Sequence, residues 1–203
     1  ASAYASLMPI ADDLIAGVGD DSYFLRRCDD GSLVWSYRSE FSGDFGVPSP
    51  VVGRHGAIFT GENNGVLWFK DLPQVRADQA TAVDERLIPD SHTPVVVANQ
   101  LLVAHDGLHS LSLRDGLSES WSVAGTQVSG YASIIASADR ALVTTEGGKL
   151  LLVDLADHPG KLLDQQTLTE SRHALLSHPA ILGDRLLVRF ENEVRCYHLP
   201  AGR

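Results

Sequence analysis

The sequence predicts an all-β fold: a β-propeller built of four-stranded blades, with about five blades in this chain. Three observations predict it. One pattern occurs five times in the 203 residues, and its equivalent positions, spaced 40 to 45 residues apart, are Leu7, Pro50, Pro94, Ile134 and Pro179. Each copy alternates short apolar runs with turns rich in Gly, Asn and Asp, and no stretch shows the 3.6-residue periodicity of a long helix. This period, with four strands per unit, is typical of propeller blades.

We assign the whole chain, residues 1–203, to a single propeller. The repeats lie at about residues 4–46, 47–90, 91–130, 131–174 and 175–203. The first and fourth copies are the best preserved pair, and both begin Tyr-Ala-Ser.

The first two strands of each unit are short apolar runs. The first strand starts on Pro or Ser, as at Pro50, Pro94 and Pro179, because proline is tolerated at the first residue of a strand but not in its middle. A polar turn and a second run follow, at residues 14–16, 57–59, 101–103, 141–143 and 186–188.

Two glycine-rich turns frame the third strand. The first is a tight hairpin, which contains Gly65 in the second copy; Gly, Asn and Asp tolerate the positive φ that such hairpins require. The third strands are expected at residues 66–69, 108–113, 150–153 and 194–197. The second turn contains Gly31, Gly116 or Gly160 and leads into a fourth strand, clearest at residues 32–37 and 117–123, which hold Trp35 and Trp121.

The repeat resembles the PQQ-like (pyrroloquinoline-quinone-like, BamB-like) propeller repeat. It lacks the Gly-His and Trp-Asp marks of WD40 blades. The PQQ-like pattern is carried by Ser-Pro-Val-Val at residues 49–52, then Gly65, Leu67 and Asp-Leu at residues 71–72. It is also carried by Gly31 to Trp35 and, with one residue inserted, by Gly116 to Trp121. Fourth-strand tryptophans occur only in copies one and three, so the docking of Trp between blades that the resemblance implies is only partly kept.

The resemblance implies one of two functions. Some members are non-catalytic scaffolds of the bacterial cell envelope, and others are quinoprotein dehydrogenases that hold pyrroloquinoline quinone and calcium on the propeller axis. The enzymes are expected to show a pair of adjacent cysteines, which Cys28 and Cys196 are not. We expect a non-catalytic, periplasmic or otherwise extracytoplasmic protein-interaction scaffold or ligand-sensing domain without a cofactor. The alternative is a propeller fragment of a PQQ- and calcium-dependent dehydrogenase.

No residue is assigned a catalytic, cofactor-binding or metal-binding role. No nucleophile elbow, phosphate-binding Gly-Lys motif or His-Glu-x-x-His is present. His105 and His109 flank a hairpin with Asp106 between them, so a weak metal site is conceivable, but we interpret them as solvated loop histidines. The two cysteines are predicted to be packed strand residues; a disulfide between them is the alternative.

One segment is a candidate interaction loop. Residues 73–92 form the longest and least repeat-like insertion, with acidic and basic residues and two prolines. Propeller loops are held in place by rigid blades and often bind partners. We expect recognition of a protein partner here; a passive linker is the alternative. The residues assigned to this loop are Gln74, Arg76, Asp78, Asp84, Glu85 and Arg86.

Charge and hydropathy exclude two kinds of partner. The net charge of −10 argues against nucleic acid, and no apolar run approaches the length of a membrane span.

The fifth copy lacks a fourth strand, and an open blade edge invites association. The chain is then part of a ring of seven or eight blades, which we favour, or a ring closed by another subunit, or a five-bladed ring with a ragged seam.

Overall fold

The computed structural model describes residues 5–19, 22–38, 46–53, 56–61, 65–72, 78–89, 92–124, 128, 130–170 and 174–199. These residues form nineteen strands in five antiparallel sheets. None of them belongs to an α-helix, and the described part of the chain accordingly contains no helix fit to span a membrane.

Each sheet is a meander whose strands pair in chain order. Blade one comprises β1 (Met8–Ala11), β2 (Leu14–Val18), β3 (Ser22–Arg27) and β4 (Leu33–Arg38). Blade two comprises β5 (Val51–Gly53), β6 (Gly56–Gly61), β7 (Gly65–Lys70) and β8 (Ala82–Asp84). Blade three comprises β9 (Val95–Val97), β10 (Gln100–Ala104), β11 (Leu108–Ser112) and β12 (Ser118–Val123). Blade four comprises β13 (Ala132–Ala136), β14 (Arg140–Thr145), β15 (Lys149–Asp154) and β16 (Leu162–Thr167). Blade five comprises β17 (Ala180–Leu182), β18 (Arg185–Arg189) and β19 (Val194–His198).

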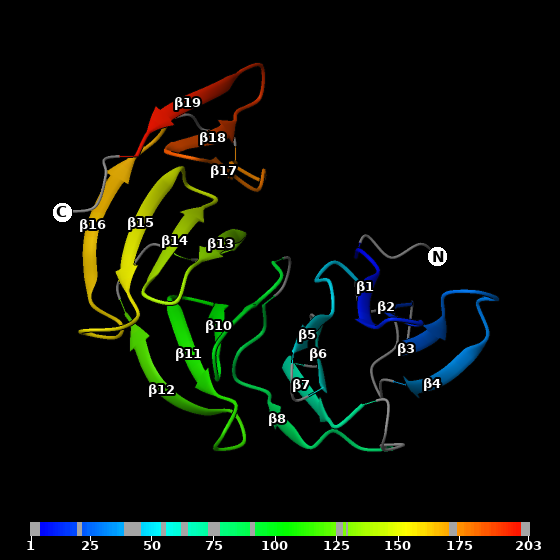
Figure 1. The fold of residues 1–203 in the computed structure, drawn as a ribbon. Helices are drawn as coiled ribbons and strands as arrows, with labels where there is room; N and C mark the ends of the chain where they lie inside the picture. Colours follow the sequence, from blue (N-terminus) through cyan, green and yellow to red (C-terminus); the bar gives the residue numbers. More distant parts are fainter. Residues whose placement is uncertain are drawn as a thin grey trace.

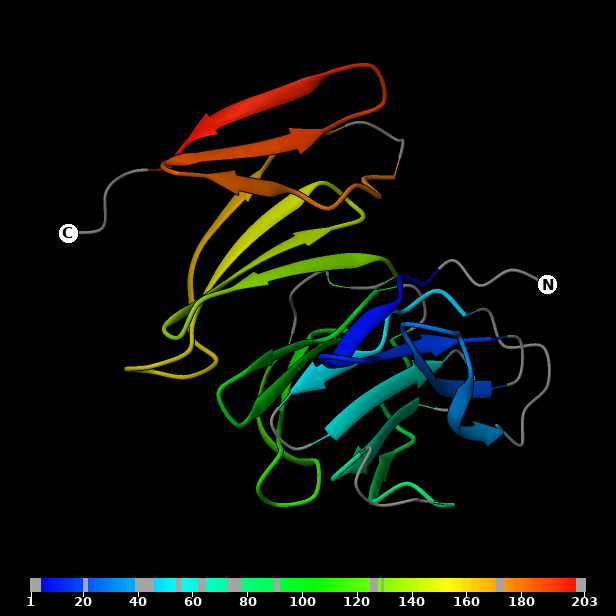
Figure 2. The same cartoon turned by 45° about the vertical axis from the view of Figure 1, so that its right-hand side comes forward.

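The sheets are arranged radially, which confirms the predicted propeller. First strands of successive blades adjoin, β1 beside β5, β5 beside β9 and β9 beside β13. Figure 1 shows the first strands on the inside of an arc and the fourth strands on its outside. Blades one and five lie at the two ends of this arc, and in the view of Figure 1 no described strand lies between them. Figure 2 shows the same blades turned by 45°.

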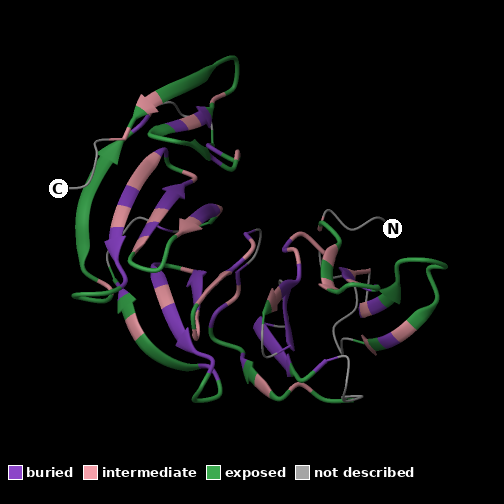
Figure 3. Ribbon diagram, viewed as in Figure 1, coloured by how far each residue is buried: buried purple, intermediate pink, exposed green. Residues whose placement is uncertain are grey.

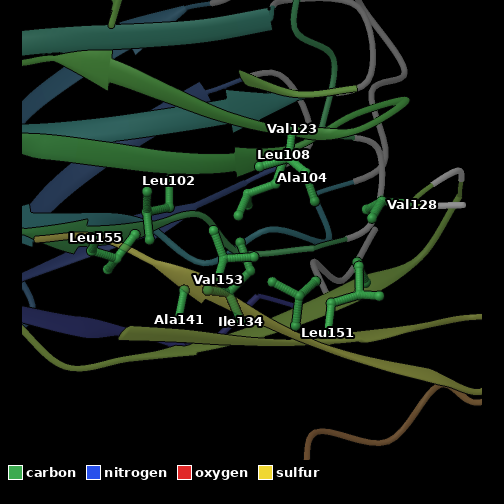
Figure 4. Packing of buried hydrophobic residues seen from close by; sticks show 12 residues of the cluster. Leu102, Ala104, Leu108, Val123, Val128, Ile134, Ala141, Leu151, Val153 and Leu155 are labelled. Carbon is green, nitrogen blue, oxygen red and sulfur yellow. The ribbon is translucent and has the colours of Figure 1, made fainter. Parts of the chain in front are cut away.

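The hydrophobic core lies between the blades rather than within them. Successive residues of a strand point to opposite faces of the sheet, so a sandwiched blade is apolar on both faces. Leu102 and Leu108 of blade three pack in one cluster with Leu151 and Val153 of blade four (Figure 4). Three further clusters fill the other three junctions between successive blades. This two-sided burial explains why the second and third strands read as nearly continuous apolar runs.

Hydroxyl groups link the starts of the first three blades. Ser6 donates its backbone N–H to Ser49 Oγ at 2.9 Å, and Ser49 donates its own N–H to Thr93 Oγ1 at 3.0 Å. The three residues occupy the same position in successive repeats, two residues before the first strand of each blade. The repeated Ser or Thr therefore serves as an acceptor for the preceding blade.

The residues that mark the repeat hold the blades together. Gly31, Gly65, Gly116 and Gly160 all have positive φ, between 64° and 85°. A Cβ at Gly160 would lie 2.9 Å from Cε3 of Trp121, so this indole from blade three packs on a turn of blade four. In the same way the ring of Trp35 lies 5.0 Å from that of Phe69 in blade two. Pro50, Pro94 and Pro179 each lie just before the first strand of their blade.

Two sequence interpretations need correction. The segment 73–92 is not a single insertion, because Ala82–Asp84 forms β8, the outer strand of blade two. The cysteines are not packed strand residues, since both are exposed and free. Cys28 lies in the turn after β3, and Cys196 lies on β19 in the blade that is covered on one side alone.

Candidate functional site

The predicted interaction loop is partly structural. Gln74 and Arg76 lie outside the described residues. Asp78 and Glu85 are exposed, whereas Asp84 is buried at the end of β8. The residues assigned to this loop thus divide between an exposed surface and a strand terminus.

Asp84 and Arg86 form an ion pair that closes the turn after β8. The Arg86 side chain donates from Nε to Asp84 Oδ1 at 3.1 Å and from Nη2 to Oδ2 at 2.6 Å, and its backbone N–H also donates to Oδ1. Burial raises the pKa of Asp84, but the hydrogen bonds and charge of Arg86 outweigh it and lower the pKa below its ordinary value. Both side chains are therefore engaged with each other.

The histidine hairpin engages His109 in contacts within the chain. His109 Nδ1 lies 2.9 Å from Glu119 Oε2, and Nε2 lies 2.9 Å from the carbonyl oxygen of His105. Both ring nitrogens thus have protein partners, and His109 lies on β11 rather than in a solvated loop. Within the described ranges, no three His, Cys, Asp or Glu side chains gather as metal ligands.

An open hollow of about 700 Å³ lies beside the hairpin between β18 and β19. Its polar wall is occupied by Arg195, which donates from Nε to Glu193 Oε1 at 2.7 Å and from Nη1 to the Leu168 carbonyl at 3.0 Å. The same guanidinium lies over the Phe190 ring, 4.3 Å from its centre. The arginine thus links the hairpin to the segment that follows β16 in blade four.

The strongest candidate for an interaction site is the outer face of blade five. Leu186 and Val188 point toward blade four and are fully buried, so the alternate residues point the other way. We call this second surface the free face. It comprises Ala180, Leu182, Arg185, Leu187, Arg189, Val194, Cys196 and His198.

The free face exposes large apolar side chains to solvent. Leu182 is 70% exposed and Val194 is 64% exposed, and Figure 3 shows most of β17 and β19 as exposed. In blade three, Leu102 occupies the position of Leu187 and is completely buried by blade four. The same surface that forms a core between blades three and four is thus not covered in blade five by any residue that the structure describes.

The outer backbone edge of β19 pairs with no other strand of the described residues. Phe190 donates its N–H to the Glu193 carbonyl at 2.8 Å, and Leu199 donates to the Asp184 carbonyl at 2.7 Å. Hydrogen-bonded and non-hydrogen-bonded pairs alternate along an antiparallel ladder, so the N–H and C=O groups of Val194, Cys196 and His198 point away from β18. Sequence reasoning noted a missing fourth strand but could not identify these residues, because register depends on the folded ladder.

Comparisons with known proteins identify the fold. No protein-family model matches the chain, and no curated protein matches it. Among solved structures, 398 chains match. One is the computationally designed Ika8 protein, with a TM-score of 0.68, 11% identity and coverage of 95% of this chain and 57% of Ika8.

Two natural proteins are similar in the same way. BamB from Moraxella catarrhalis has a TM-score of 0.65 and 12% identity, with coverage of 96% of this chain and 61% of BamB. The β-propeller domain of Cps50 (Swd1) from Myceliophteria thermophila has a TM-score of 0.66 and 13% identity, with coverage of 98% of this chain and 66% of that domain. The chain therefore spans 57% to 66% of the length of these three structures. At such low identity the similarity shows the β-propeller fold alone.

Proposed function

We propose that this chain acts as a non-catalytic β-propeller scaffold of the PQQ-like type, which binds a protein partner outside the cytoplasm through the free face of blade five. The observation that carries the proposal is the exposure of Leu182 and Val194 on a sheet face whose counterparts in other blades form inter-blade cores. Exposed apolar patches of this kind mark interaction sites.

The buried titratable groups support a structural rather than a catalytic role. Asp84 holds Arg86, and His92 accepts the Ala104 N–H through Nε2. Asp154 accepts the N–H groups of Ala156 and Asp157 and the Arg140 guanidinium. The hydrogen bond from Ala156 is the main cause that lowers the pKa of Asp154. Each group therefore has at least one hydrogen-bond partner within the chain.

The extracytoplasmic location is supported by the repeat pattern, which resembles that of exported PQQ-like propellers, and by the structural similarity to BamB. Cell fractionation of the native protein tests it directly: recovery in the cytoplasmic fraction contradicts the location.

The ligand-sensing role and the quinoprotein alternative predict a bound small molecule. Addition of pyrroloquinoline quinone and calcium, followed by an absorption spectrum and a dye-reduction assay, tests the enzyme; turnover of an alcohol or sugar overturns the non-catalytic assignment.

Site-specific photo-crosslinking in living cells tests the interaction face. A photoreactive residue at Leu182 is expected to crosslink to one defined protein. The matched control is the same residue at Val83, which is 46% exposed on the outer strand of blade two and is expected to give no specific product. Equal crosslinking from both positions, or none from Leu182, contradicts the proposed interaction face.

A further inference from the structure

We propose that the junction between blades four and five holds a bound water molecule, which bridges the hydroxyl groups of Ser133 on β13 and Thr144 on β14. The site lies between two described blades and is separate from the free face of blade five. It assigns a ligand to the interior of the propeller, which the proposed scaffold function does not.

Ser133 and Thr144 lie opposite each other on one face of blade four. The ladder between β13 and β14 pairs these two residues directly. Two positions away the Tyr131 carbonyl accepts the Glu146 N–H at 2.8 Å, and hydrogen-bonded pairs recur at every second position of an antiparallel ladder, so this pair is hydrogen-bonded as well. The Cα atoms of such a pair are about 5.5 Å apart, and the side chains project to the same side.

That side of blade four faces blade five. The chain neighbours Ile134 and Val143 belong to the cluster shared with blade three, and successive residues of a strand alternate between its faces. On the opposite face, Leu142 packs in a cluster with Leu186 of blade five. The hydroxyl groups of Ser133 and Thr144 therefore lie in the junction between blades four and five.

Both hydroxyl groups are buried. Ser133 and Thr144 are each 1% exposed, and neither hydroxyl oxygen has a hydrogen-bond partner among the described residues. A buried hydroxyl that bonds to nothing destabilises the folded state. The adjacent Thr145 shows the usual arrangement, because its Oγ1 accepts the Lys149 N–H at 3.2 Å.

The repeat pattern explains why Ser133 needs another partner. It occupies the position of Ser49 and Thr93, whose hydroxyl groups each accept a backbone N–H from the preceding blade. Ser133 is paired within the regular ladder of blade four and directs its hydroxyl to the following blade instead. The direct link between blades is thus not repeated at Ser133.

Water is the ligand that fits this pair. Each hydroxyl can donate one hydrogen bond and accept two, and buried waters typically bond two to four polar groups that have no other partner. Two hydroxyl groups on neighbouring strands can both reach a water placed between them. Because both residues are almost completely covered, a ligand much larger than water would have to separate the two blades.

A crystal structure of the 203-residue chain, at a resolution that shows ordered water, tests the site directly. We expect electron density for one water at about 2.5 to 3.0 Å from both hydroxyl oxygens. A well-defined junction without such density, or a protein group bonded to the two hydroxyls in its place, overturns the proposal.

Thermal denaturation of Thr144→Val distinguishes the two possibilities by the sign of the effect. Valine removes the hydroxyl at nearly constant shape. If the hydroxyl bonds a water, the variant leaves the other hydrogen-bonding groups of the site unsatisfied, and the midpoint is expected to fall by about 2 to 4 °C. If the hydroxyl has no partner, valine removes a buried unpaired group, and an unchanged or higher midpoint overturns the proposal.

A double variant tests whether the two residues share one water. Ser133→Ala is expected to lower the midpoint by a similar amount, and Ser133→Ala with Thr144→Val by little more than either change alone, because both remove the same bridge. Ser122→Ala changes an exposed serine on β12 and, as the control, should leave the midpoint nearly unchanged. Fully additive losses from the two single changes contradict a shared water.

Discussion

His92 makes the stability of this protein depend on pH. The side chain is 1% exposed, and its Nε2 accepts the N–H of Ala104 at 2.9 Å. The proton of the neutral ring is therefore on Nδ1, which has no hydrogen-bond partner among the described residues. Burial, with smaller contributions from the charges of His105 and His178, lowers the pKa of His92 to about 3.

The magnitude follows from the difference between folded and unfolded pKa values. An unfolded histidine titrates near 6.5, so between pH 6.5 and 3 the unfolded chain binds one more proton at this site than the folded chain. Stability therefore rises with pH across this window: the contribution is complete above about pH 6.5 and decreases as the pH falls toward 3. The slope is about 1.4 kcal/mol per pH unit, or about 2 to 3 kcal/mol between pH 6.5 and 4.5.

Denaturant unfolding at pH 7, 5.5 and 4.5 tests this, with the variants His92→Gln and His158→Gln. Glutamine can still accept the Ala104 N–H but does not titrate, so its free energy of unfolding should lack this acid slope. His158 is exposed, and its replacement should leave the slope unchanged. Carboxylates with lowered pKa values contribute equally to all three proteins and cancel in the differences. Parallel pH profiles for the wild type and His92→Gln refute the reasoning.

Three further substitutions test the contacts between blades. Gly160→Ala should lower the free energy of unfolding by about 1 to 3 kcal/mol, because the added Cβ meets the Trp121 indole and the residue has a positive φ. The control Gly183→Ala also has a positive φ but open space around it, so it should lower stability clearly less. Equal shifts of the two variants in thermal denaturation contradict the packing argument. Phe59→Ala empties a fully buried position between blades one and two and should cost about 3 to 5 kcal/mol in urea unfolding; a loss under 1 kcal/mol is inconsistent with a core there. Ser49→Ala removes the hydroxyl that accepts the Ser6 N–H from the preceding blade and should lower the free energy of unfolding by about 1 kcal/mol. Amide hydrogen exchange at Ser6 should become faster, and unchanged exchange there argues against the link.

The strand meander was predictable because its signals are local. Apolar runs and glycine turns recur at a nearly constant period, and each hairpin is built from residues close in sequence. The short outer strand β8 was missed for the same reason: Ala82–Asp84 has no apolar run and lies in a long polar segment. Its pairing with β7 is visible only in the folded sheet.

The candidate site was predictable only in outline. The second and third strands of the fifth repeat were predictable from their apolar runs, but the outward-facing residues of β19 follow from ladder register. The burial of His92 likewise depends on the blades packed around it, and no local pattern in the sequence indicates it.

The sequence by itself determined the repeat, the strand order and the turns, because these depend on neighbouring residues and on a regular period. Only the tertiary structure decided which faces are covered. Blade five has the same apolar alternation as the other blades, and nothing local distinguishes Leu187 from its buried counterpart Leu102. Whether such a face is core or binding surface depends on the sheet beside it, and that neighbour is remote in the chain or belongs to another molecule.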